Sequence, residues 1–84
     1  METKIALIGI IVENKESAAQ TNELLHEYAS YIVGRMGLPY QQKGVSIISI
    51  VVDAPENIIS ALSGKLGRIT GISVKSMLAK TNNK

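Results

Sequence analysis

The segment SGKLGRITGISVK, residues 63–75, is the first place to look for chemistry, because it combines three glycines with Lys65 and Arg68. Glycine-rich turns bind phosphate where a strand leads into a helix, because free N–H groups and the positive helix end then point at the anion. Here an apolar helical stripe ends and an apolar strand follows, and the P-loop spacing G-x-x-x-x-G-K-[ST] is absent. We therefore interpret Gly67 as the left-handed end of a helix and Gly71 as the turn into a strand.

Metal-binding and catalytic side chains are scarce in this chain. His26 is the single histidine and there is no cysteine, which excludes disulfides, thiolate zinc sites and thiol nucleophiles. Copies of His26 and Glu23 could converge in an oligomer, but a surface or interfacial histidine is the favoured interpretation. Ser63 and Lys65 lack the S-x-x-K spacing, and a single histidine without a partner forms no triad. The sequence predicts no catalytic residue, no metal and no cofactor.

A polar turn, Glu13 to Glu16, follows the first apolar run of the chain. Asn14 and Lys15 could contact a small anion there, although a polar turn alone is the commoner meaning of such residues. These two residues are the candidate ligand-binding residues.

The composition indicates one small soluble domain over residues 1–84. The chain is 45% hydrophobic and 19% charged, with a net charge of +2. A chain this short buries only ~60–65% of its unfolded surface, so association with further copies would add to a thin core. No apolar run approaches the ~20 residues of a membrane span, and the N-terminal run is predicted to be a strand and not a signal peptide. We expect a cytoplasmic protein with no membrane contact.

Basic residues dominate the last third of the chain, and such a bias can attract nucleic acid. Lys65 and Arg68, however, suit the last turn of a helix, and Lys75 and Lys80 suit the protection of an edge strand. No aromatic residue stands on a predicted central strand, so the stacking platform of RNA-binding modules is missing. We expect no direct DNA binding by this domain alone.

Two strands, residues 5–12 and 45–53, are apolar on both faces, as central strands are. Between them Ser17 and Gln20 form a weak capping box that predicts the start of a helix. Apolar residues then recur at helical spacing as far as Met36, which predicts a helix ending near Gly34 or Gly37. Proline forbids further helix at position 39, and residues 40–43 are expected to form a short strand before a turn at Gly44.

A second helix is predicted from Pro55, with a buried stripe at Ile58, Ile59, Leu62 and Leu66. Residues 72–80 are the last strand, and residues 81–84 are expected to be a frayed tail. The order strand, helix, strand, strand, helix, strand predicts an α+β, ferredoxin-like βαββαβ fold. Its four-stranded antiparallel sheet carries two helices on one face, with the first and third strands in the centre.

The face of this sheet away from the helices is predicted to be an interface between copies of the chain. A bare face should carry many polar residues, yet both faces of the two central strands are mainly apolar. The set containing Gly9 and Ser49 is assigned to the bare face, because small residues suit an interface better than a thin core. The predicted interface residues, in a dimer or tetramer, are Ile5, Leu7, Gly9, Ile11, Val45, Ile47, Ser49 and Val51.

The residues NELLH, 22–26, and the glycine-marked stretch 61–75 carry a resemblance to a known family. Together with the Glu-rich turn and the apolar third strand, they resemble the iron-only hydrogenase system regulators, small ACT-like proteins. The resemblance implies a fold similar to the C-terminal domain of nickel-responsive regulators, an oligomer and a regulatory role. ACT domains hold amino acids near the loop after the first strand, but in this chain that loop lacks their usual glycine, which argues against amino-acid binding.

These observations lead to a prediction of a non-enzymatic regulatory or sensing module. The resemblance implies a transcriptional regulator linked to an iron-only hydrogenase system, acting as a homo-oligomer through a small-molecule ligand or a partner. The alternative is a protein–protein adaptor without a small ligand, and a nucleic-acid-binding protein is a third hypothesis. The chain has no basic recognition helix before Ile5, so a regulator of this size would need a partner to reach DNA.

Overall fold

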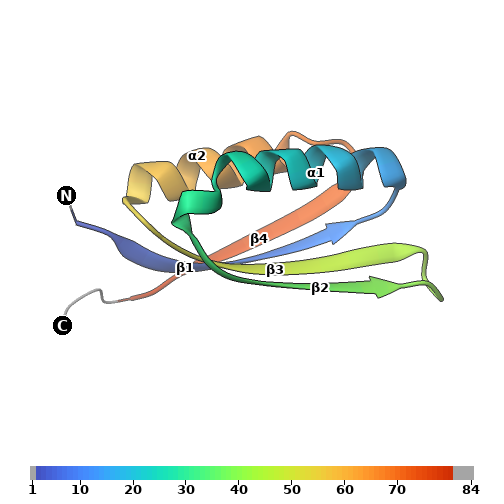
Figure 1. Ribbon diagram of the computed structural model, residues 1–84, viewed down its shortest axis with the longest axis horizontal. Helices are drawn as coiled ribbons and strands as arrows, with labels where there is room; N and C mark the ends of the chain where they lie inside the picture. Colours follow the sequence, from blue (N-terminus) through green and yellow to red (C-terminus); the bar gives the residue numbers. More distant parts are fainter. Residues whose placement is uncertain (1, 81–84) are drawn as a thin grey trace.

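The computed structural model describes residues 2–80 and contains a four-stranded antiparallel sheet with two helices on one face (Figure 1). The elements in chain order are β1 Lys4–Val12, α1 Lys15–Glu27, a 3₁₀ turn Ala29–Tyr31, β2 Ile32–Tyr40, β3 Val45–Ala54, α2 Glu56–Gly67 and β4 Ile72–Leu78. The strand order β2-β3-β1-β4 confirms the predicted ferredoxin-like fold with the first and third strands in the centre. The predicted tail 81–84 lies outside the described residues.

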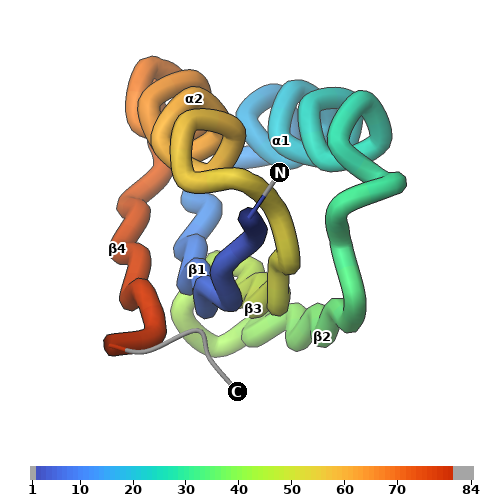
Figure 2. The backbone as a smooth tube through the Cα atoms, turned by 90° about the vertical axis from the view of Figure 1, so that its left-hand side faces the viewer, coloured from blue at the N-terminus to red at the C-terminus, as the bar shows by residue number. Residues whose placement is uncertain are grey.

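The end-on view shows both helices on the upper side of the sheet (Figure 2), and the core lies between these two layers. Alternate residues of β1 and β3 point into it, because successive side chains of a strand face opposite ways. The buried hydrophobic residues are Ala6, Ile8, Ile10, Val12, Leu25, Ile48, Ile50, Val52, Ala54, Ile59, Leu62 and Leu66. Within residues 2–80 no helix is long and apolar enough to cross a membrane.

The prediction for the first helix and second strand was wrong in its boundary. The helix ends at Glu27, and a short 3₁₀ turn leads directly into β2. Ile32 and Met36 therefore lie on a strand, and the predicted strand 40–43 is mostly the turn between β2 and β3. Ile32 follows Tyr28 at a helical spacing of four, which extended the apolar pattern past the true end of the helix.

The start of α1 also differs from the prediction. Asn14 is the N-cap, and its side-chain oxygen accepts a hydrogen bond from the backbone N–H of Ser17 at 2.8 Å. The Ser17 hydroxyl, predicted to cap the helix, instead donates to the backbone carbonyl of Thr70 and is buried. The structure thus starts the helix earlier and fastens it to the turn before β4.

Gly71 has a φ of +87°, which confirms its predicted role in the turn into the last strand. Its carbonyl accepts a hydrogen bond from the N–H of Glu13 at 2.9 Å. Gly67, predicted to be the left-handed end of α2, is helical, and Arg68 follows as a right-handed C-cap. A left-handed residue is not needed there, because the Arg68 and Ile69 N–H groups bond back to Lys65 and Leu66 carbonyls.

Candidate functional site

The lower face of the sheet, away from the helices, is the most distinctive surface of the molecule. We call it the open face. Its residues are those of β1 and β3 that alternate with the core residues and point away from the helices: Ile5, Leu7, Gly9, Ile11, Val45, Ile47, Ser49 and Val51. Ile5, Leu7 and Ile11 are 45%, 41% and 43% exposed, whereas their neighbours Ala6, Ile8 and Ile10 are buried. The structure therefore places all eight predicted interface residues on the side that the helices leave bare.

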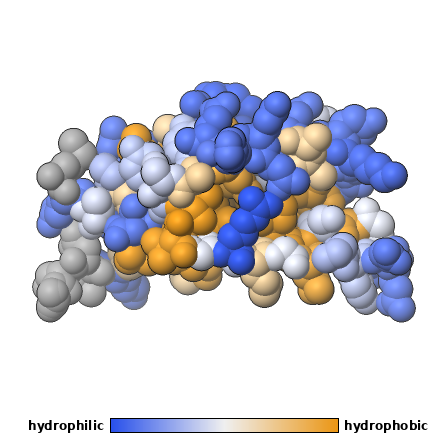
Figure 3. Space-filling view, in the orientation of Figure 1, coloured by the Kyte–Doolittle hydropathy of each residue, from blue (hydrophilic) through white to orange (hydrophobic). Residues whose placement is uncertain are grey.

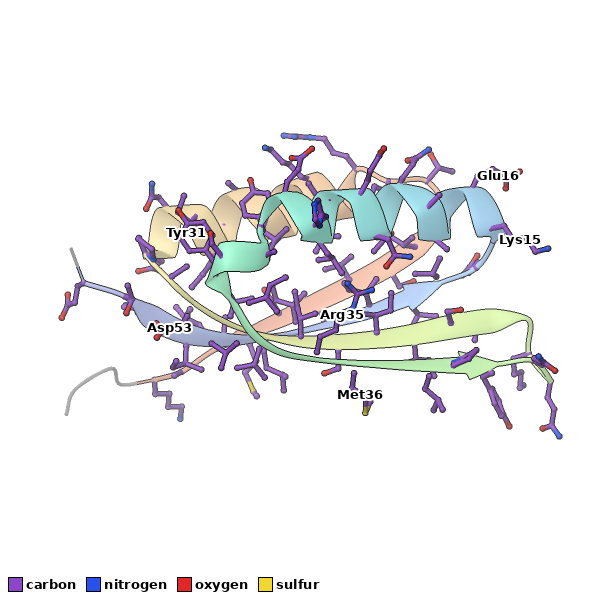
Figure 4. The ribbon with its side chains drawn as sticks, in the orientation of Figure 1. Lys15, Glu16, Tyr31, Arg35, Met36 and Asp53 are labelled. Carbon is purple, nitrogen blue, oxygen red and sulfur yellow. The ribbon has the colours of Figure 1, made fainter. Side chains whose placement is uncertain are left out.

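The edge strands extend the open face with further apolar side chains. In the strand register Met36 and Leu38 of β2 lie opposite Ser49 and Ile47, and Met77 of β4 lies opposite Leu7. Met36 points away from the helices (Figure 4), and both methionines are more than half exposed. Hydrophobic residues gather below the helices across the middle of the molecule, while the outer surface of the helices is hydrophilic (Figure 3).

The middle of the open face is shallow, because Gly9 pairs with Ser49 across the two central strands. A Cβ atom at Gly9 would have only the Lys75 carbonyl within reach, at 4.0 Å. Two hollows, of about 290 and 280 Å³, lie beside the pair of Gly9 and Ser49, along β1 and β4. Ridges of isoleucine, leucine and valine thus flank a valley, a shape that suits the side chains of a second apolar surface.

Asn14 and Lys15, the candidate ligand-binding residues, begin α1 beside a pocket of about 370 Å³. The pocket lies between the start of α1 and the β2–β3 turn and is also lined by Pro39, Tyr40 and Gly44. The Asn14 side-chain oxygen is engaged with Ser17, so its structural role as a helix cap is clear. Lys15 also lines this pocket, and its side chain extends outward at the start of α1 (Figure 4). Among residues 2–80 the ion pair found does not involve Lys15, so its charge can meet an anion.

His26 and Glu23 are both exposed on α1. Among residues 2–80 there is no cluster of three histidine, cysteine or acidic side chains that could hold a metal ion. A metal site built from His26 and Glu23 of several copies stays an alternative prediction.

Sequence reasoning missed a second groove, of about 250 Å³, between α1 and β2. Arg35, which the sequence placed in a helix, stands on the α1 side of β2 (Figure 4) and donates a hydrogen bond to the side-chain oxygen of Asn22. Gly37 follows two residues later, and a Cβ atom there would meet nothing within 4 Å. The pattern of a basic residue and a glycine two apart would have marked this groove only if β2 had been recognised as a strand.

Lys65 adds a local electrostatic feature at the end of α2. Its Nζ atom lies 5.3 Å from the centre of the Tyr28 ring. A side-chain hydrogen bond with Tyr28, and the charge of that group, raise the pKa of Lys65 above its ordinary value. The lysine thus links the two helices, and the glycine-marked segment has a structural role in this fold.

Three comparisons bear on what this geometry does. The family model described as "TM1266-like: Iron-only hydrogenase system regulator, putative" matches residues 4–76. The solved structure of the uncharacterized protein TM1266 from Thermotoga maritima is similar, with a TM-score of 0.91 and 36% sequence identity. The match covers 94% of this chain and 100% of that one. No curated protein matches the sequence.

Proposed function

The chain belongs to the TM1266-like family of iron-only hydrogenase system regulators, and we propose that it is itself a non-enzymatic regulator that acts as a homo-oligomer. In this proposal the open face joins copies of the chain, and the assembled protein responds to a small ligand or binds a partner. The regulated system is the one that the family description names, and control at the level of transcription would require a DNA-binding partner.

The open face is the observation that carries the proposal. The four strands lie about 4.8 Å apart, and β1 and β2 have nine residues each, β3 has ten and β4 has seven. With a rise of ~3.3 Å per residue they give a flat area of ~550 Å². Side-chain relief increases that area towards the ~800 Å² that each partner buries in a stable interface. At ~25 cal/mol per Å², every 100 Å² of apolar surface contributes ~2.5 kcal/mol before the costs of association. A second open face has the same shape and the same apolar character.

Two features support a role without catalysis. The single histidine, His26, is exposed, and Glu23, which lies three residues before it on α1, is exposed as well. In addition, the pKa of Lys65 is raised, whereas a lysine that acts as a base or nucleophile needs a lowered one. Both features support a role in binding and not in catalysis.

A small ligand would bind at the pocket beside Asn14 and Lys15 in this proposal. A ligand present at 100 times its dissociation constant stabilises the native state by about 2.7 kcal/mol. Amino acids, nucleotides and divalent metal ions should be screened by thermal unfolding, with Lys15→Ala as the matched variant. A stabilising compound that loses its effect in Lys15→Ala supports sensing. If the whole screen leaves the melting temperature unchanged, the adaptor without a small ligand is favoured.

The regulatory role is tested in cells that carry the gene together with an iron-only hydrogenase. We expect deletion of the gene to change hydrogenase transcript or protein levels, and the wild-type chain to restore them. Ile47→Lys, which places a charge in the open face, should fail to restore them, whereas Ala61→Lys, on the exposed surface of α2, should succeed. Hydrogenase levels that do not respond to deletion would contradict the proposed function.

A further inference from the structure

The outer edge of β2, together with the groove under α1, has the features of a binding site for an extended peptide. The backbone direction at this edge follows from the register. The Ile5 carbonyl bonds to Ala79 N–H and the Glu13 N–H to Gly71, so the odd-numbered residues of β1 direct their backbone groups towards β4. Even-numbered residues of β1 then face β3, because successive residues of a strand alternate.

The same alternation reaches β2 through β3. Ile8 lies opposite Ile50, so even-numbered residues of β3 face β1 and odd-numbered ones face β2. Met36 lies opposite Ser49, so even-numbered residues of β2 face β3. Arg35, Gly37 and Pro39 therefore present their backbone groups to the outer edge, and the missing N–H of a proline fits that position.

Edge strands are normally blocked against further pairing, and the ends of β2 carry two such features. The register shifts between Ile32 and Gly34, and Pro39 lacks a donor. Between them, no strand within residues 2–80 pairs with the outward N–H and C=O groups of Arg35 and Gly37, so these groups form a short unpaired ladder. This length suits a segment of a few residues and is too short for unlimited sheet growth.

The helix side of β2 is more open than that of β4, the other edge strand of the sheet. α2 packs closely on β4, whereas α1 makes few contacts with β2. Ala18, Pro39 and Ser46 line both the groove of about 250 Å³ and the pocket of about 370 Å³, so the two hollows adjoin along β2. A strand placed beside β2 would therefore direct alternate side chains into existing space.

Two side-chain positions give the groove its selectivity. Arg35 is exposed and bonds to an uncharged group, Asn22, and within residues 2–80 the ion pair found joins Lys4 and Glu56 instead. An acidic side chain opposite Arg35 would complete a charge-assisted contact. Opposite Gly37 the absence of a Cβ atom leaves room for a large apolar side chain in the groove that Ala18 and Ile48 line.

We propose that this site binds an extended peptide segment of a partner protein, added to β2 as a fifth strand, with an acidic and a large apolar residue two positions apart. Strand addition draws affinity from backbone hydrogen bonds and specificity from alternate side chains, as both features here provide. The inference rests on the proposed function only in that a regulator needs a partner.

The test is selection of a displayed library of random heptapeptides on the full chain. We expect enriched sequences to carry an acidic and an apolar residue two apart, and Arg35→Glu to enrich a basic residue at the acidic position. Gly37→Pro removes an outward N–H and should weaken an enriched synthetic peptide at least tenfold. Ser76→Pro makes the same change on the outward side of β4 and should leave that affinity within twofold.

Three outcomes would overturn the inference. These are no enrichment, enrichment without a change of sign in Arg35→Glu, and equal peptide affinity for Gly37→Pro and the wild-type chain. A change in sedimentation of Gly37→Pro without peptide would assign the edge to a second copy of the chain and would also overturn it. Failure of the open-face proposal is separate, because it is read from Ile47→Lys without any peptide.

Discussion

The two faces of strands β1 and β3 have nearly the same amino-acid character and opposite surroundings. On the helix side Ile8 and Ile50 are completely buried, whereas on the open face Ile11 keeps 43% of its surface exposed. Burial of apolar surface drives folding on the first side, and nothing within residues 2–80 covers the second. The difference teaches that one apolar face forms the core of the single chain. The other apolar face could form a second buried layer if it packed against a second copy of the chain.

The largest expected effect separates these two faces within one strand. Ile8→Ala removes a fully buried side chain and should lower the free energy of unfolding by about 2–5 kcal/mol, measured by urea denaturation. Ile11→Ala on the open face is the matched variant. Its cost should be below ~1 kcal/mol in dilute protein and should rise with protein concentration, because only association buries Ile11.

If Ile11→Ala cost as much as Ile8→Ala at every concentration, the comparison between the two faces would fail. Equal and small effects of both variants would contradict the assignment of the core to the helix side.

A smaller loss of stability is expected at Gly71, where the turn before β4 contacts the start of α1. A Cβ atom at Gly71 would lie 2.6 Å from Asn14 Nδ2 and 2.7 Å from Ser17 Oγ, at a positive φ. Gly71→Ala should therefore lower the free energy of unfolding by about 2–3 kcal/mol, again by urea denaturation. Gly44→Ala, at a φ of +67° in open space, should cost about 1 kcal/mol. Equal costs at the two glycines would show that the contact with the α1 cap is unimportant.

The helix side of the sheet also contains a buried polar group whose replacement should stabilise the protein. The Thr21 hydroxyl is buried and has no hydrogen-bond partner among the described residues. Thr21→Val keeps the shape and removes the unsatisfied group, so the free energy of unfolding should rise by about 1 kcal/mol. Ser17→Ala is the contrasting variant, because that hydroxyl donates to Thr70 and its loss should destabilise. A loss of stability in Thr21→Val would show that the hydroxyl is satisfied in solution.

The smallest effect on stability is expected at Lys65, in the last turn of α2. Because the folded state raises its pKa, the charged form is favoured by folding, and this contribution is fully present below the ordinary value of 10.5. It is lost as the pH rises through the raised pKa. Lys65→Met should therefore reduce stability slightly at neutral pH and have no effect at higher pH, in thermal unfolding across a pH series. An effect that grows with pH would contradict the assigned contact with Tyr28.

The strands of the core were predictable from sequence because they lie in the same environment along their length. β1 and β3 are rich in β-branched and aliphatic residues along most of their length, and α2 carries a clear stripe of buried residues. The boundary between α1 and β2 was not predictable in the same way. The edge strand β2 has a weak apolar pattern, because most of its residues are exposed. Its glycine and proline residues also disfavour a strand on local propensity alone.

The candidate sites show the same contrast. The apolar alternation placed the eight open-face residues on one side of the sheet, because period two depends only on strand geometry. The groove under α1 could not be predicted, since the first helix was predicted to end near Gly34 or Gly37, and residues two apart in a helix do not stand on one face. The register of β2 shows that Arg35 and Gly37 share the helix side, because they lie opposite the buried residues Ile50 and Ile48.

Sedimentation velocity across micromolar concentrations tests the central claim, that a second copy covers the open face. We expect the wild-type chain to sediment as a dimer or tetramer, and Ile47→Lys to form smaller and less stable species, because association would bury an unpaired charge. Ala61→Lys adds the same charge to the exposed surface of α2 and should sediment like the wild-type chain. A wild-type chain that remains a monomer at these concentrations would contradict the account.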